Sequence, residues 1–479
     1  MNATAPDPRR WKALILICTA IFVVVLDIAI VNVALPTIGE DLHFKESNLQ
    51  WVITAYALTY GGFLLLGGRA ADLIGRRIVF MGGLALFTAA SLTCGLASSE
   101  AMLIIARGVQ GFGAAIVTPA ALSIISTTFT EGSERNKALG AWGAVGGSGA
   151  AAGVLMGGVL TKYLGWEWIF WVNVPVGAIV LVLTPFYVRE SRRTDVIHDY
   201  DVTGAASVTT GLVVLVYAIS QAPDVGWGTF RTIGLIVLSA ALLVFFLIWE
   251  YRFAERPLMP LGIFRIRLVA AANLGGFLLA GGMYGTFLLL TLYMQQVLHL
   301  SVLQTGVAFL ATAGTAVVMA GPAQALTTRL GAKPVLVTGM TLLVLGCLWY
   351  TQIDADGSYF VDLMPGFFAV GIGIPFSFIP ITIAALAGVQ SDDAGLASGL
   401  INTSQQVGGA IGTAILSTVA FTHADTLVKE GTDPGLAATS GFQWGFWVAA
   451  GIWAAGLVCA LTLVRREEVA QPEPVELGA

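Results

Sequence analysis

Apolar residues run along this chain in long stretches, and the charged residues gather in short clusters between them. The stretches reach about 18 residues or more, the length at which a helix can cross the hydrocarbon core of a bilayer. The pattern therefore predicts fourteen membrane-spanning helices. They cover residues 12–35, 50–70, 78–97, 101–126, 137–161, 167–188, 203–221, 230–250, 269–293, 303–327, 334–352, 361–387, 395–421 and 441–464.

The composition agrees with this pattern. Hydrophobic residues make up 56% of the 479 residues and charged residues 11%, whereas soluble domains carry about 25% charged residues. Glycine occurs 57 times, and small residues let helices pack closely in lipid. The expected fold class is all-α, a polytopic membrane protein. The first apolar run is too long for the core of a signal peptide, so we expect it to be the first helix.

The basic residues predict the orientation of the chain. With fourteen helices both termini lie on one side, and 19 of the 24 Lys and Arg residues then fall in the loops of that side. Four fall in the opposite loops, and Arg107 lies within a span. Because basic loops stay in the cytoplasm, we expect both termini to be cytoplasmic.

Two short cytoplasmic turns suggest an internal repeat. Residues 68–77 and 327–333 both contain a glycine followed closely by a basic residue, and they lie eight predicted helices apart. Two six-helix repeats with two helices inserted between them explain this spacing. We therefore predict an N-terminal bundle over 1–195, an inserted pair over 196–262 and a C-terminal bundle over 263–479.

Two opposite charges lie inside the predicted spans at similar depth. Asp27 lies roughly 13 Å below the outer end of the first helix, and Arg107 roughly 9 Å below the outer surface. A charged group in a bilayer is costly and normally faces a partner or a cavity. We expect Asp27 to bind and release a proton and Arg107 to respond to it. The alternative is a permanent ion pair that only joins helices.

Two further motifs carry glycines at defined positions. Gly68, Asp72, Gly75, Arg76 and Arg77 form a cytoplasmic turn in which Asp72 can cap the following helix. We expect this turn to control the conformation, although basic residues there also anchor topology. The fifth predicted helix carries a smooth face for close helix packing, which either seals the transport pathway or serves packing alone. That face is formed by Gly149, Gly153, Gly157 and Gly158.

Several side chains are candidates for a substrate cavity, although membrane aromatics more often face lipid or core, and polar groups also bond across helices. They are Asn32, Trp142, Tyr284, Phe287 and Gln405. No cluster of His, Cys, Asp or Glu suggests a metal or catalytic site, and no phosphate-binding loop is found. The four His residues are scattered in loops, and no loop is long enough for a sensing domain, which argues against an enzyme or a receptor.

At these motifs the sequence resembles the major facilitator superfamily, and within it the fourteen-helix drug:proton antiporter branch. The resemblance covers nearly the whole chain. One difference lies in helix 5, where Val154 follows Gly153 and the branch usually has proline. The matching segments are Asp27 with Asn32 and Pro36, Gly68–Arg77, Leu103–Gly111, the helix 5 glycines, and Gly165–Phe170 with Asn173 and Pro175.

The resemblance implies proton-coupled efflux of hydrophobic or amphiphilic small molecules by alternating access. Multivalent-cation exporters of the branch use additional membrane acids in the second bundle, which this sequence lacks, so neutral, monocationic or zwitterionic substrates are expected. The expected partners are the proton, the substrate and the lipid of a bacterial inner membrane, with a monomeric protein and neither cofactor nor nucleic acid. The alternative is a lipid or metabolite transporter of the same fold, since fold does not fix the substrate.

Overall fold

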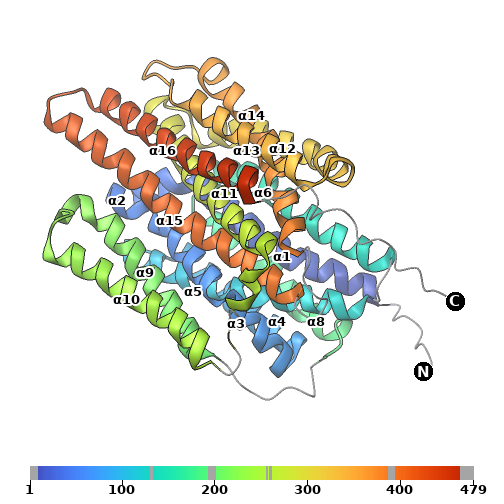
Figure 1. The fold of residues 1–479 in the computed structure, drawn as a ribbon. Coiled ribbons are helices and arrows are strands. Elements are labelled where there is room, and N and C mark those ends of the chain that lie inside the picture. Colours follow the sequence, from blue (N-terminus) through green and yellow to red (C-terminus); the bar gives the residue numbers. More distant parts are fainter. Residues whose placement is uncertain are drawn as a thin grey trace, which may run out of the picture.

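The computed structural model describes residues 9–129, 133–191, 201–254, 257, 261–386 and 394–463, and every regular element in them is helical (Figure 1). The long helices are α1 (Arg10–Asp41), α3 (Trp51–Ile74), α4 (Arg76–Gly95), α5 (Glu100–Thr128), α6 (Ser133–Tyr163), α8 (Asn173–Tyr187), α9 (Val202–Val225), α10 (Phe230–Arg252), α11 (Arg267–Leu292), α12 (Val302–Leu330), α13 (Ala332–Tyr350), α14 (Met364–Leu386), α15 (Ala394–Lys429) and α16 (Pro434–Leu463). Short helices are α2 (Glu46–Leu49), α7 (Trp168–Trp171), η1 (Leu261–Arg265), η2 (Tyr293–Val297) and η3 (Tyr359–Leu363).

Each predicted span falls on a described helix, because long apolar runs form hydrogen-bonded helices in lipid. In the described part of the chain, 11 helices are long and apolar enough to cross a membrane. The all-helical prediction is thus confirmed, while the count of fourteen crossings stays a prediction.

Polar signals set several helix ends. The Ser99 side chain accepts a hydrogen bond from the Met102 amide at the start of α5, and Ser301 forms a capping box with Gln304 at the start of α12. Gly75 and Gly331 have φ of 133° and 86° between consecutive helices. Residues with a side chain rarely adopt this backbone conformation, so glycine suits both turns.

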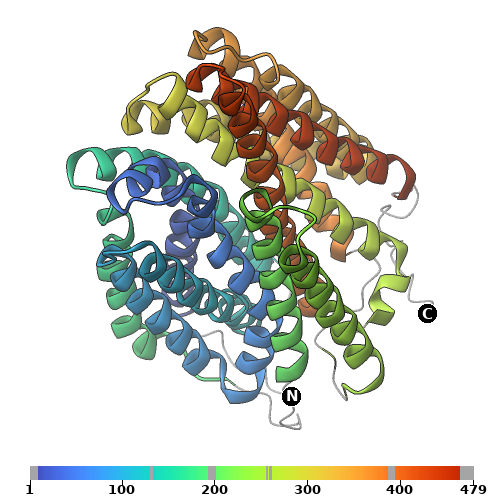
Figure 2. The ribbon, with the colours of Figure 1, turned by 90° about the vertical axis from the view of Figure 1, so that its left-hand side faces the viewer.

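The long helices pack in two groups and a peripheral pair. In the first group α5 packs on α3 and α4, and α1 packs on α6 and α8. In the second, α11 packs on α15 and α16, and α13 on α14 and α16. Helix α9 contacts α10, α3 and α15, and Figure 2 shows this green pair beside both groups. The predicted domain boundaries stay a prediction.

The two groups meet along two helix pairs, α3 with α15 and α6 with α12. Near the outer end predicted from the sequence, the Gln295 amide donates to the Val33 carbonyl at 2.9 Å. There the Ser417 hydroxyl also donates to Gln50 Oε1 at 2.5 Å. These polar contacts join α1 and α3 to helices of the second group.

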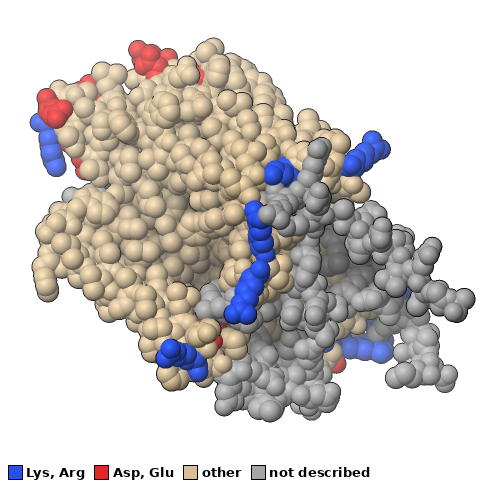
Figure 3. All heavy atoms as spheres, viewed as in Figure 1, with Lys and Arg blue, Asp and Glu red and all other residues tan. Residues whose placement is uncertain are grey.

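Charged side chains lie mostly at the two ends of the molecule. In Figure 3 most acidic side chains gather at the upper left, and most visible Lys and Arg lie toward the opposite end. Along α10, large apolar side chains such as Phe230, Val237 and Phe245 are exposed. Exposed apolar surface of this kind is typical of contact with lipid, and the charge distribution agrees with the predicted orientation.

Candidate functional site

Asp27 and Arg107 form an ion pair in the interior of the first helix group. Arg107 Nη1 lies 2.5 Å from Asp27 Oδ2, joining α5 to α1. The side chain of Asp27 is 0% exposed and that of Arg107 is 1% exposed. A buried charge of this kind needs a partner and hydrogen bonds, because desolvation penalises each ion by several kcal/mol. The predicted contact between these residues is therefore present in the structure.

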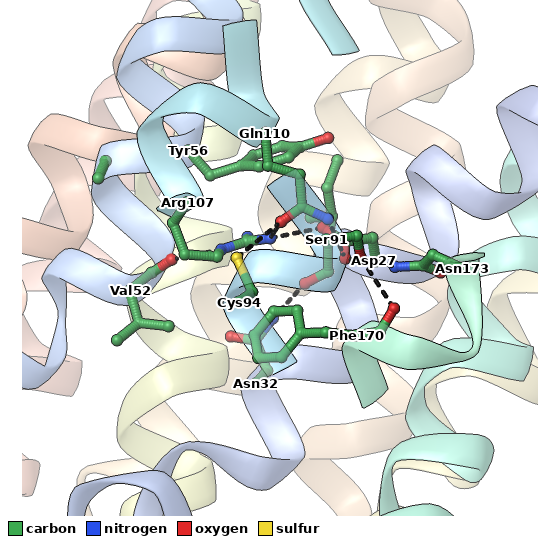
Figure 4. A network of polar contacts seen from close by, with 12 residues as sticks. Asp27, Asn32, Val52, Tyr56, Ser91, Cys94, Arg107, Gln110, Phe170 and Asn173 are labelled. Carbon is green, nitrogen blue, oxygen red and sulfur yellow. Dashed lines mark hydrogen bonds and ion pairs between the residues drawn. The ribbon is translucent and has the colours of Figure 1, made fainter. Parts of the chain in front are cut away.

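Two amides complete the coordination of the carboxylate (Figure 4). Gln110 Nε2 and Asn173 Nδ2 each donate to Asp27 Oδ1 at 2.8 Å. Gln110 Oε1 in turn accepts from Arg107 Nη1 at 2.7 Å. Asn173 Nδ2 also donates to Ser91 Oγ at 3.0 Å. The carboxylate thus accepts hydrogen bonds from three side chains, an arrangement that suits its ionised form.

The guanidinium is held on its other sides by α3 and α7. Arg107 Nε donates to the Val52 carbonyl at 2.9 Å. The Tyr56 ring lies 4.3 Å from the guanidinium carbon and the Phe170 ring 5.8 Å from it. Aromatic faces attract a cation most strongly when water is excluded. Arg107 therefore has favourable contacts besides its ion pair with Asp27.

A glycine in α5 permits the close approach of α5 and α3. A Cβ atom at Gly111 would lie 2.3 Å from the Tyr56 carbonyl oxygen. Any side chain larger than hydrogen would force the helices apart. Gly111 therefore positions Tyr56 beside Arg107.

Chemically, Asp27 is a group that could accept a proton, and protonation would break its ion pair with Arg107. Protonation of Asp27 removes the negative charge that attracts Arg107, and the amides of Gln110 and Asn173 remain as neutral donors. Because α1 and α5 carry the two charges, the proton changes the attraction between two helices. This arrangement is suited to coupling a proton to helix movement.

The predicted glycine face of α6 packs against the helix that carries Asp27. Cβ atoms added at Gly149, Gly153 and Gly157 would lie 3.2, 2.7 and 2.8 Å from the carbonyl oxygens of Phe22, Leu26 and Ile30, respectively. Gly158 faces α12, where a Cβ would lie 3.1 Å from the Val302 carbonyl oxygen. Helix α6 therefore packs on both α1 and α12, and three of its glycines set the distance to α1.

Replacement of Gly153 by valine is expected to lower the free energy of unfolding by about 1–3 kcal/mol, the usual range for overpacking. The added side chain would displace α1 at Leu26, directly beside Asp27. Thermal unfolding of the purified variant measures this loss. Gly451→Val is the control, because no atom lies within 4 Å of a Cβ at Gly451. Equal losses in the two variants would contradict a role for close α1–α6 packing.

The predicted gating turn lies between α3 and α4 and contacts the end of α8. Arg77 Nη1 donates to the Val188 carbonyl at 3.3 Å, and the Arg76 amide donates to the Ser191 carbonyl at 3.0 Å. Gly68 lies in the last two turns of α3, where a Cβ would lie 3.4 Å from Pro119 of α5. The side chain of Asp72 lies outside the described residues.

Among the described side chains, Glu190 is the acid that binds the start of α4. Its carboxylate accepts hydrogen bonds from the amides of Arg77 and Ile78, both at 3.1 Å, and lies 3.7 Å from Arg77 Nε. A Cβ at Gly75 would lie 2.8 Å from Glu190 Oε1. Glycine at position 75 is thus required both by its positive φ and by this close carboxylate.

The second turn of the predicted repeat has the same construction. Gly331 has a positive φ, and Lys333 Nζ donates to the Leu461 carbonyl at 2.7 Å near the end of α16. Arg77 likewise reaches a carbonyl just after the end of α8. In both groups a basic residue after a glycine turn ties the third helix to the last, as the predicted repeat would require.

Replacement of Glu190 by alanine is expected to lower the free energy of unfolding by about 1 kcal/mol, because two amides at the start of α4 lose their acceptor. Glu190→Gln keeps an acceptor but removes the charge, so its loss should be smaller. Thermal unfolding at low and high salt separates the two contributions. Wild-type stability of the alanine variant would show that this contact is dispensable.

The predicted cavity residues do not form one cluster. The Asn32 amide donates to the Ile28 carbonyl of its own helix, and Phe287 packs edge-on against Phe309 at 5.6 Å. Trp142 packs against the core of the first group. Tyr284 bonds to Gln406, whereas Gln405 lies beside Gly276 of α11. The cavity set stays a prediction. It did not include Gln406, the hydrogen-bond partner of Tyr284.

Sequence reasoning also missed the supporting partners of the ion pair. Gln110 lies three residues after Arg107, a spacing that places both on one helix face. Asn173 is a buried polar residue at the start of α8. The spacing was a usable signal for Gln110, whereas the contact of Asn173 with Asp27 depends on the packing of α8 against α1.

Comparison with known proteins places this architecture in a family. The model of the Major Facilitator Superfamily matches residues 17–413. The puromycin resistance protein of Streptomyces alboniger is 41% identical, covering 93% of this chain and 88% of that protein. The cephamycin export protein CmcT of Amycolatopsis lactamdurans is 38% identical, covering 87% and 86%.

Solved structures show the same fold. A peptide transporter (POT) in complex with sulfate has a TM-score of 0.68 at 16% identity, covering 95% of this chain and 96% of that one. A bacterial homologue of the human lysosomal transporter Spinster, in an inward-facing conformation, has a TM-score of 0.65 at 15% identity, covering 96% and 99%. On the family match and the similarity to its relatives, the chain belongs to the Major Facilitator Superfamily.

Proposed function

We propose that this protein exports hydrophobic or amphiphilic small molecules, including antibiotics, in exchange for protons. The observation that carries the proposal is the buried Asp27–Arg107 pair, whose carboxylate is held by three side chains from two other helices, α5 and α8. A protein that needs only stability gains little from burying an ion pair, since apolar residues of similar volume often serve as well or better. A proton-binding role gives this costly pair a purpose.

The relatives support export as the direction of transport. Their names describe puromycin resistance, cephamycin export, and tetracenomycin C resistance and export. These relatives are antibiotic or drug exporters, so we extend export of small molecules to this chain. The individual compounds are properties of those proteins, and for this chain they serve as test substrates.

The cycle follows from the charges of the site. A proton bound at Asp27 from the outside weakens its attraction to Arg107 and favours one arrangement of the helices. Release of the proton to the cytoplasm restores the pair, and substrate binding favours release. Coupling arises because proton and substrate each favour a different state. The outer contacts Gln295–Val33 and Ser417–Gln50 would break when the outside opens.

The membrane arrangement is part of the same proposal. Fourteen crossings, two six-helix bundles and cytoplasmic termini in a bacterial cell membrane agree with the helices and with the loop charges. The α9–α10 pair would be the insertion between the bundles. A single chain contains both bundles, so the proposed working unit is a monomer.

Reconstituted vesicles test this function. Protein in liposomes is given an inward-directed or outward-directed pH gradient, and puromycin and a cephamycin are followed across the membrane. Transport against the drug gradient, driven by the proton gradient and abolished by a protonophore, is the expected result. Transport of a lipid or an endogenous metabolite, with no proton-driven movement of any tested drug, would replace this proposal with the alternative substrate class.

A further inference from the structure

Tyr56 carries a hydroxyl group that the proton site does not use. The side chain is 2% exposed, and its hydroxyl has no hydrogen-bond partner among the described residues. In Figure 4 its ring lies beside the Arg107 guanidinium, and no dashed line reaches its hydroxyl. A buried hydroxyl without a partner costs about 1–3 kcal/mol, so a ligand that accepts its hydrogen bond would remove this penalty.

Tyr60 lies one turn further along α3, with its ring centroid 5.8 Å from that of Tyr56. The next residue, Gly61, touches the second bundle, since a Cβ there would lie 2.8 Å from Gln406 Cβ of α15. The two tyrosine rings thus lie beside the contact between α3 and α15. Tyr60 donates its own hydrogen bond to Thr118 Oγ1 at 3.0 Å.

The second bundle contributes a third tyrosine at the same level. Tyr284 of α11 donates to Gln406 Oε1 at 3.3 Å, and its ring lies against Gly409 of α15. Gln406 therefore lies between Tyr284 and Gly61, the α3 residue that follows Tyr60. Three aromatic rings and one amide therefore come from opposite bundles to one region beside the ion pair.

Resting on the proposed function, we propose that Tyr56, Tyr60, Tyr284 and Gln406 recognise an uncharged ligand with an aromatic ring and a hydrogen-bond acceptor. The Tyr56 hydroxyl donates to that acceptor, and the rings of Tyr60 and Tyr284 pack on the aromatic part.

The absence of net charge at this site determines the ligand class. Among the described residues, the charged side chain that touches it is Arg107, whose charge is neutralised by its partner Asp27. A ligand with several positive charges would find no unpaired carboxylate among the described residues there. An aromatic ring gains favourable packing on phenol rings, and an acceptor gains the Tyr56 hydrogen bond.

Tyr56 also links the ligand to the proton site. The Tyr56 ring covers the Arg107 guanidinium. A ligand that binds the Tyr56 hydroxyl therefore contacts the same side chain that packs on Arg107. This position explains how an uncharged molecule acts on a charged pair without contacting it directly.

Two neutral fluorescent dyes provide the test. Nile red has fused aromatic rings with a carbonyl acceptor, and N-phenyl-1-naphthylamine has aromatic rings without one. Fluorescence polarisation with purified full-length protein measures binding of each. Tyr56→Phe keeps the ring over Arg107 and removes the hydroxyl. We expect it to weaken Nile red binding about 3- to 10-fold and to leave the binding of the other dye unchanged.

Tyr350→Phe is the matched control. Tyr350 of α13 is also buried with an unpartnered hydroxyl, but it packs against Phe367 and Phe446, away from the ion pair. This variant should bind both dyes as the wild type does. An equal effect of Tyr56→Phe on both dyes, no effect on either, or failure of wild-type protein to bind Nile red would overturn the proposal.

Failure of the ligand site and failure of the proposed function give different results. Proton-driven transport is measured in vesicles with the wild-type protein, so its outcome does not depend on any change at Tyr56. Proton-driven transport without dye selectivity would reject only the ligand site. Dye selectivity without any proton-driven transport would reject proton coupling and retain the ligand site.

Discussion

Replacement of Asp27 by asparagine is expected to abolish proton-driven drug efflux while the protein still folds. Asparagine has nearly the same size and still accepts hydrogen bonds from Gln110 and Asn173, but it cannot bind and release a proton. Drug moving down its own gradient should still exchange across the membrane. Vesicle transport with and without a pH gradient measures the two activities separately.

Glu40→Gln is the control for this experiment. Glu40 lies exposed near the end of the same helix, so it tests whether removing any carboxylate from α1 has the same effect. The control should retain proton-driven efflux. If the Asp27 variant also retained it, Asp27 would have no part in coupling and the acid would have to lie elsewhere.

The largest expected effect on stability comes from replacing Arg107 by glutamine. This change leaves the Asp27 carboxylate buried without its cation, and breaking one side of a buried pair lowers the free energy of unfolding by about 3–5 kcal/mol. Adding Asp27→Asn should restore much of this loss, because the double variant buries neither charge. Thermal unfolding of the two single variants and the double variant measures the interaction between the residues. An Arg107→Gln variant as stable as the wild type would show that the pair contributes nothing to the stability of the folded state.

Sequence reasoning predicted the helices well because membrane insertion is encoded by local hydropathy. The apolar runs leave the backbone no alternative to helical hydrogen bonding. The π-helical turns η2 and η3 were not predicted, because they extend helices whose hydropathy does not change. The turn η2 contains Gln295, whose amide reaches Val33 of the other bundle, a contact that has no signature in a single sequence.

The core of the site was predictable and its surroundings were not. Asp27 and Arg107 stand out because a charge within an apolar run is rare, and their depths predicted that they meet. Glu190 lies among basic residues of a loop that the sequence predicts to be cytoplasmic, where nothing distinguishes it from a solvated acid. Its role at the start of α4 depends on where α8 ends in space. Gln406 and Gln405 are adjacent, and helix rotation decides which one faces Tyr284.

The central claim is that drug and proton compete through Asp27. Proton release from purified protein in a weakly buffered solution, during titration with the puromycin and dye ligands, tests it most directly. The account predicts release with wild-type protein on binding of a substrate, and no release with Asp27→Asn although the same compound still binds. Release that survives the substitution, or binding to wild-type protein without release, would contradict it.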